Sequence, residues 1–293
     1  MRKMLSALLC LALPLSATAG EARAFKNPYV AYQARDWVTC ARLYAAQADR
    51  DPPVGGAAYD AACCLALAGD REGAFARLLA TPTSQLRRHI AEDPDLVSLH
   101  GDPRWIRLIE HFHRDEAERA ATMDTALRTE LLRRMSLDQE LRGKYLQDTE
   151  NQALGAQLTE VDRDNTRWLK ETLKARGWPG YTLVGRDGSM AAWLLAQHAD
   201  LEPAFQEEVL AILGSAVERG EASGAHLAYL TDRVRLAQGK TQVYGTQFHT
   251  VDGKAVPLPL ENPEQVDERR RAVGLITLEE YSEQMNSRSP STQ

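Results

Sequence analysis

The sequence has no long run of basic residues. Its 293 residues include 35 lysines and arginines against 41 aspartates and glutamates, which gives a formal charge of −6. Beyond the N-terminus the longest basic run is Arg269-Arg270-Arg271. Proteins that bind nucleic acid neutralise phosphates with clustered lysine and arginine. This charge pattern therefore excludes nucleic acid as an expected partner.

Motifs with the spacing of known catalytic and metal sites are also missing. The sequence contains no His-x-x-x-His, His-Glu-x-x-His or zinc-type cysteine pair. Residues 185–189 (GRDGS) lack the Gly-x-Ser-x-Gly of a nucleophile elbow, and neither a phosphate-binding glycine loop nor a dinucleotide fingerprint occurs. We therefore expect no metal and no cofactor.

Long apolar runs are absent beyond the N-terminus. There, Arg2 and Lys3 precede an apolar stretch, 4–17, that is shorter than the ~20 residues of a membrane span and contains a proline. A small-x-small pattern, residues 17–19, follows. These features predict a signal peptide over residues 1–19, cleaved near Ala19. We expect a periplasmic or secreted protein without stable membrane insertion.

Cysteine is scarce, and three cysteines follow the signal peptide: Cys40, Cys63 and Cys64. All three lie in alanine-rich helical segments, which favours buried small apolar side chains, since free cysteine is among the most buried residue types. The alternative is a disulfide between Cys40 and either Cys63 or Cys64, as suits an oxidising compartment.

The N-terminal segment has an internal period of 34 residues. Phe25, Ala34, Asp36 and Cys40 align with Tyr59, Ala68, Asp70 and Ala74. This is the tetratricopeptide (TPR) period of paired helices. Residues 59–105 resemble the TPR-like end module of many exported bacterial proteins. The resemblance implies either protein or peptide binding or a scaffold for the next domain.

Helical patterns continue to the C-terminus. We expect a TPR-like module over 22–115, a linking helix over 116–135 and a helical domain over 136–287, with a disordered tail over 288–293. Ser136 and Gln139 fit a capping box for a new helix. Helices are expected near 137–148, 154–176, 188–199, 201–219, 223–238, 263–273 and 277–287. The fold class is thus all-α.

One segment of this domain has a different pattern. Polar and apolar residues alternate over 241–248, Asp252-Gly253 predicts a tight turn, and 255–259 extends beyond it. This pattern predicts a small β-hairpin on the helical body.

Six blocks of residues in this domain together resemble one bacterial family catalogued only as a domain of unknown function. In order they are Asp138-Gln139-x-x-Arg142, Val161-Asp162-x-x-Asn165, Gly177-Trp178-Pro179, Gln197-His198-Ala199-Asp200, Tyr229 to Val234 (YLTDRV) and Gln242 to Phe248 (QVYGTQF). The resemblance runs from about residue 130 to 285 and implies no reaction.

Two interpretations of function follow. The favoured one is an exported cell-envelope protein that binds a protein or a small molecule. The alternative is a hydrolase-like enzyme with His198 as acid or base and Asp200 or Asp232 orienting it. The residues expected to hold a ligand in such a cleft are Arg233, Tyr244, Thr246, Gln247 and Trp178, with His249 as a further candidate. Helix capping by Asp200 and an Asp232–Arg233 pair that holds the hairpin are the structural alternatives.

The export hypothesis predicts the mature N-terminus. Mass spectrometry of the protein from the periplasmic or secreted fraction should find a chain that starts at Gly20. A mature chain that retains Met1 would contradict the hypothesis. A non-reducing peptide map of the same sample decides between free cysteines and a bridge to Cys63 or Cys64.

Overall fold

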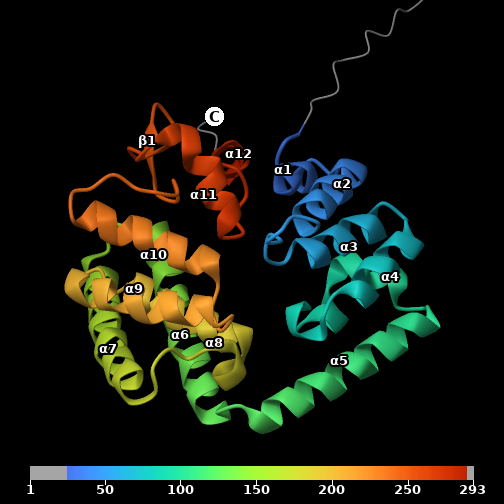
Figure 1. The fold of residues 1–293 in the computed structure, drawn as a ribbon, viewed down its shortest axis with the longest axis horizontal. Coiled ribbons are helices and arrows are strands. Elements are labelled where there is room, and N and C mark those ends of the chain that lie inside the picture. Colours follow the sequence, from blue (N-terminus) through green and yellow to red (C-terminus); the bar gives the residue numbers. More distant parts are fainter. Residues whose placement is uncertain (1–24, 289–293) are drawn as a thin grey trace, which may run out of the picture.

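The fold is built from α-helices arranged in two halves that are joined at both ends. A computed structural model describes residues 25–288, and the expected signal peptide (1–19) and almost all of the expected tail (288–293) lie outside them. Figure 1 shows the first half in blue to green and the second in green to red. One two-stranded antiparallel sheet accompanies the helices. The expectation of an all-α fold with a small β-hairpin is confirmed.

The first half begins with two helical pairs that use the same turn. They are α1 (Pro28–Gln33) with α2 (Trp37–Ala48) and α3 (Ala57–Leu67) with α4 (Arg71–Ala80). In both turns a residue with positive φ, Arg35 or Gly69, precedes an aspartate that caps the next helix. The Asp36 and Asp70 carboxylates accept backbone N–H groups of Thr39 and Gly73, which satisfies donors that the first turn leaves free.

A disulfide joins Cys40 of α2 to Cys64 of α3, with the two Cα atoms 5.9 Å apart. The favoured expectation of unbridged cysteines is therefore wrong for this pair and holds only for Cys63, which is a buried free thiol. Adjacent positions on a helix point in different directions, so only one of Cys63 and Cys64 faces α2.

Short 3-10 turns and a long helix complete the first half. The turns are η1 (Thr83–Gln85), η2 (Ile90–Glu92) and η3 (Pro94–Leu99), and α5 (Pro103–Thr122) follows. The start of α5 packs Trp105, Leu108 and Phe112 against buried side chains of α3 and α4. These helices share one hydrophobic core, so α5 is anchored to the helical pairs.

The second half begins with α6 (Thr125–Gln147), one continuous helix. Helix α5 ends just before it, and Met123 and Asp124 separate the two helices. The Asp124 carboxylate caps α6 by accepting the backbone N–H of Leu127. The expected helix start at Ser136 is therefore wrong. The Asp124 carboxylate also accepts a bond from Arg176, which connects this junction to the helix that ends at Arg176.

Four more helices form the body of this half: α7 (Gln152–Arg176), α8 (Tyr181–Gln197), α9 (Pro203–Glu218) and α10 (Gly224–Ala237). A single core of leucine, alanine and valine side chains joins them to α6, with Leu169, Val184 and Leu213 fully buried. In α8, Gly185 has a positive φ of 74° and kinks the helix.

The hairpin lies further along the chain than expected. Its strands are β1 (Phe248–Val251) and β2 (Lys254–Pro257), joined by Asp252-Gly253, both with positive φ. The turn prediction is confirmed, but residues 243–247 form a loop rather than a strand. Just before this loop, Gln242 makes an isolated bridge to Leu260.

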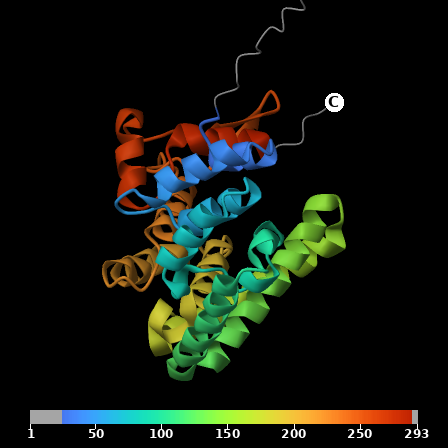
Figure 2. The same ribbon diagram turned by 90° about the vertical axis from the view of Figure 1, so that its right-hand side faces the viewer.

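The chain ends on helices that return to the first half. After η4 (Pro263–Gln265), α11 (Val266–Ala272) leads to α12 (Leu278–Arg288), which lies beside α1 in Figures 1 and 2. Asn27 donates to the Glu280 carbonyl at 2.7 Å, and its backbone N–H donates to Glu283 at 2.9 Å. No helix among residues 25–288 is long and apolar enough to cross a membrane.

Candidate functional site

The loop at residues 243–246 is held by a buried carboxylate. Asp232 of α10 has no exposed surface. It accepts the backbone N–H groups of Val243 at 2.7 Å, Tyr244 at 3.0 Å and Thr246 at 2.9 Å. The Thr246 hydroxyl adds a fourth bond at 2.9 Å. These bonds occupy the Asp232 carboxylate, which leaves it no role as a general base or as the partner of His198.

Gln247 points back into the same loop. Its side-chain amide donates to the Thr246 hydroxyl at 3.0 Å, and its backbone N–H donates to buried Gln242 at 3.0 Å. Gln242 in turn donates to the carbonyls of Gln247 and Leu258. The side chains of Thr246 and Gln247 thus bond within the loop, and His249 lies exposed on β1.

Arg270 of α11 binds the opposite side of this loop. Its Nη1 donates to the Tyr244 carbonyl at 2.6 Å and its Nε to the Ile276 carbonyl at 2.6 Å. The side chain is completely buried, and Nη2 has no hydrogen-bond partner among the described residues. Burial lowers the pKa of Arg270 from its usual value. Sequence reasoning missed this residue, because an arginine in a basic run is ordinarily solvent-exposed.

Arg233 and Asp200 form an ion pair. Two bonds of 2.7 and 2.6 Å join the guanidinium of α10 to the carboxylate that follows α8. Burial acts to raise the pKa of Asp200, but the Arg233 bonds and charge bring it below its usual value. Asp200 also accepts from Gln206 at 3.2 Å. The structural interpretation of Arg233 agrees with this geometry, although its partner is Asp200 rather than Asp232.

His198 is oriented by Asp138, not by Asp200 or Asp232 as expected. Asp138 of α6 is fully buried, and its Oδ2 lies 2.9 Å from His198 Nδ1. Nδ1 also lies 2.9 Å from Nε of Arg142, which can only donate, whereas the Asp138 carboxylate can only accept. These two contacts place opposite demands on Nδ1. Nε2 bonds to no residue between 25 and 288, and the His198 side chain is 12% exposed.

Two further charged residues complete this cluster. Arg142 donates to Asp138 at 3.1 Å and to Asp162 of α7 at 2.5 Å. Burial acts to raise the pKa of Asp138, but the bond and charge of His198 outweigh it and lower that pKa. Burial raises the pKa of Asp162, with Arg142 opposing the rise. Three helices therefore place an imidazole, two carboxylates and a guanidinium together.

Trp178 belongs to the hydrophobic core. It is 6% exposed, packs with the leucines of α7 and α8, and donates from Nε1 to the Ser189 hydroxyl at 3.1 Å. A buried indole N–H needs such a partner. Trp178 thus packs as part of the core, and its role in ligand binding stays a prediction.

The candidate residues thus occupy separate environments: the loop held by Asp232, the Asp200–Arg233 ion pair, the His198 cluster and the core around Trp178. No one hydrogen-bond network joins all of these side chains among residues 25–288. Asp138, Arg142 and Asp162 were visible only as members of the family-like blocks, since nothing in their spacing pointed to His198.

A cavity of about 510 Å³ lies where the two halves meet. Its wall from the first half includes Tyr32, Asp60 and Asp95, and its wall from the second half includes Arg270 and Tyr281. Pockets of a few hundred cubic ångströms with a few convergent polar groups are the usual sites of small ligands. None of the sequence-derived candidates lines this cavity.

A set of possible metal ligands lies beside this cavity. In the described part of the chain, Cys63, Asp93 and Asp95 are the one group of three whose ligand atoms lie within 4.8 Å of one another. None of His198, Asp200, Asp232 and His249 belongs to such a group among residues 25–288.

Residues 125–288 match the model of a protein family of unknown function, DUF6624. This segment is more than half of the chain. The chain belongs to the DUF6624 family. The match extends from the first residue of α6 to the last residue of α12, so the DUF6624 region includes the His198 cluster, the Asp232 loop and Arg270. No curated protein and no solved structure gives a significant match.

The Asp232 geometry predicts a large effect of substitution within the DUF6624 region. Asp232→Asn should lower the free energy of unfolding by about 3 kcal/mol or more, because the amide nitrogen faces N–H donors and leaves buried groups unpaired. Asp200→Asn is the matched control. Its half-exposed ion pair should be worth less than about 1 kcal/mol. Urea unfolding of both variants measures the difference, and equal losses would contradict the assignment.

Proposed function

We propose that this DUF6624 protein is an exported protein that binds a small molecule in the cavity between its two halves. The observation that carries the proposal is the cavity itself, about 510 Å³, with charged and aromatic side chains from both halves in its walls. A ligand held there contacts both halves at once. Binding would therefore stabilise their association as well as each half.

Export is part of the proposal and has two supports. One is the N-terminal pattern of a basic pair, an apolar stretch and a small-x-small site. The other is the Cys40–Cys64 disulfide, since such bonds persist in oxidising compartments.

The TPR-like first half serves as a scaffold in this proposal. Helix α3 is buried along most of its length, with Tyr59, Ala62 and Cys63 in the core. This leaves α3 little free surface for a protein or peptide partner. The same helix supplies Asp60 and Cys63 to the cavity.

Ligand binding predicts a gain in thermal stability that depends on the cavity. A panel of small amines, carboxylates, amino acids, sugars, phosphate and divalent metals should include a class that raises the melting temperature, because a ligand at 100 times its Kd adds about 2.7 kcal/mol. Gly55→Trp, at a cavity-lining position with open space around its Cβ, should abolish this rise.

Gly101→Trp is the matched control, since Gly101 also has open space but does not line the cavity. It should respond to ligand as the unsubstituted protein does. If no compound class shifts the melting temperature, or if Gly55→Trp responds normally, the proposal fails.

A second candidate is acid–base catalysis at His198. It rests on the Asp138–His198 contact at Nδ1, as in hydrolases that orient histidine with aspartate, and on Nε2, which has no partner among residues 25–288. Two buried polar atoms nearby, Asn165 Nδ2 and Gln197 Oε1, have no partner among the described residues. Arg142 places positive charge beside the ring.

His198→Asn tests this candidate. With ester, amide and phosphoester substrates, the substitution should lower turnover by about 10²–10⁴-fold, the usual contribution of a general acid or base. Asp200→Asn, outside the hydrogen-bonded pair, should retain most of the activity. Equal rates for the wild-type and His198→Asn proteins would exclude catalysis by His198.

A further inference from the structure

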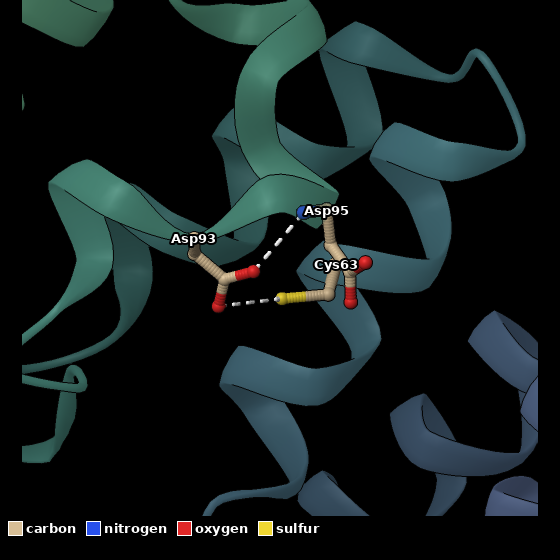
Figure 3. A group of neighbouring side chains, drawn as sticks. All are labelled: Cys63, Asp93 and Asp95. Carbon is tan, nitrogen blue, oxygen red and sulfur yellow. Dashed lines mark hydrogen bonds between the residues drawn. The ribbon is translucent and has the colours of Figure 1, made fainter.

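The wall of the cavity from the first half is acidic. Asp95 accepts both of its side-chain bonds from the Tyr32 hydroxyl, at 3.0 and 3.1 Å. Asp93, beside it in Figure 3, accepts the Tyr59 hydroxyl at 2.7 Å. No lysine, arginine or histidine between residues 25 and 288 forms a salt bridge with either carboxylate. Arg87 also lines this wall and pairs with Asp60, so Asp93 and Asp95 lie together with no salt bridge of their own among the described residues.

The ionisation of neighbouring groups reflects this negative charge. Burial raises the pKa of Asp60 to about 6, with Asp93 and Asp95 adding to the rise and Arg87 opposing it. Burial and the Asp95 carboxylate raise the pKa of Tyr32 to about 12. Burial and the same carboxylates raise the pKa of the Cys63 thiol. A cation bound at this wall would offset the repulsion among these groups.

The opposite wall carries the complementary charge. Arg270 lines the cavity with its side chain fully buried. Nε and Nη1 are bound to backbone carbonyls, and Nη2 is the nitrogen of the guanidinium without a partner. A buried unpaired N–H of a charged group is costly, and a carboxylate is the partner that a guanidinium binds best.

Aromatic rings also line the cavity. Tyr32 and Tyr44 come from the first half and Tyr281 from α12, where its ring lies 5.1 Å from the Arg270 guanidinium carbon. Tyrosine faces attract cations and pack well against short aliphatic chains.

We propose that the cavity binds a small zwitterion, with a primary ammonium against Asp95 and a carboxylate against Nη2 of Arg270. This inference rests on the proposed function and names the chemical class of its ligand. The class includes amino acids and short peptides, whose opposite charges match the opposite walls. Neither a simple amine nor a simple carboxylate satisfies both walls.

A metal ion at Cys63, Asp93 and Asp95 is the competing occupant. The Asp93 and Asp95 oxygens already accept hydroxyl and amide protons. A metal ion there also leaves Nη2 of Arg270 unpaired. A zwitterion provides an opposite charge for the carboxylate of one wall and for the guanidinium of the other.

Four six-carbon probes test the proposal by calorimetry on the full mature chain, freed of metal by chelation. L-norleucine and 6-aminohexanoate are isomers that differ in the separation of their charges, and hexylamine and hexanoate each carry one charge. At least one isomer should bind tenfold or more tightly than either single-charge probe. Equal binding of all four, or no binding by either isomer, overturns the proposal.

A substitution in each wall tests which charge of the ligand that wall binds. Asp95→Asn should weaken the zwitterion at least tenfold and leave hexanoate unchanged, whereas Arg270→Lys should weaken hexanoate. Tyr32→Phe, which removes only a neutral partner of Asp95, should keep the preference for the zwitterion. Because Arg270 also holds a loop, the Arg270→Lys result counts only if that variant still melts in one cooperative transition. If it does not, the Asp95→Asn result alone decides.

The outcomes separate this inference from the proposed function. If a sugar or phosphate binds and Gly55→Trp blocks it, the cavity binds ligands but the zwitterion inference is wrong. If Zn²⁺ binds tightly and Cys63→Ser abolishes its binding, a metal occupies the acidic wall and the zwitterion inference is also wrong. If no probe or panel compound binds, both proposals fail.

Discussion

One loop held between two buried charges organises the second half of the molecule. The Asp232 carboxylate accepts N–H groups of Val243, Tyr244 and Thr246 from one side. The Arg270 guanidinium donates to carbonyls of Tyr244 and Gly245 from the other. A buried charge is expensive unless hydrogen bonds replace its water. Here the peptide groups of a single loop satisfy an anion and a cation on opposite sides.

This arrangement determines what Arg270 can do. Its bonds to the loop and to Ile276 hold the side chain in the cavity wall, and they leave Nη2 without a partner among the described residues. The same segment continues into α12, which packs on α1 and brings the second wall against the first. The loop thus contributes to the cavity indirectly, through the arginine it holds, since neither Tyr244 nor Gln247 lines the cavity.

The sequence predicted the local features well. The Asp252-Gly253 turn depends on neighbouring residues only, and it forms where it was expected. The strand assigned to 241–248 was wrong because alternation looked like a sheet pattern, whereas the N–H groups bond a side chain and Gly245 takes a φ of 68°. Alternation of polar and apolar side chains does not show which acceptors the backbone N–H groups bond.

The contacts that matter for the site are long-range, and this is why they were missed. Asp138 meets His198 across 60 positions, and Arg270 meets Gly245 across 25. The cavity joins residues from both ends of the described chain. No local pattern encodes such pairings; they follow from how the two halves close on each other.

Hydrogen exchange of the loop amides tests the central claim most directly. If Asp232 and Arg270 hold the loop, the amides of Val243, Tyr244 and Thr246 exchange as slowly as the core amides of α10, although they lie outside any helix or strand. Exchange as fast as that of the exposed Thr250 amide would contradict the account.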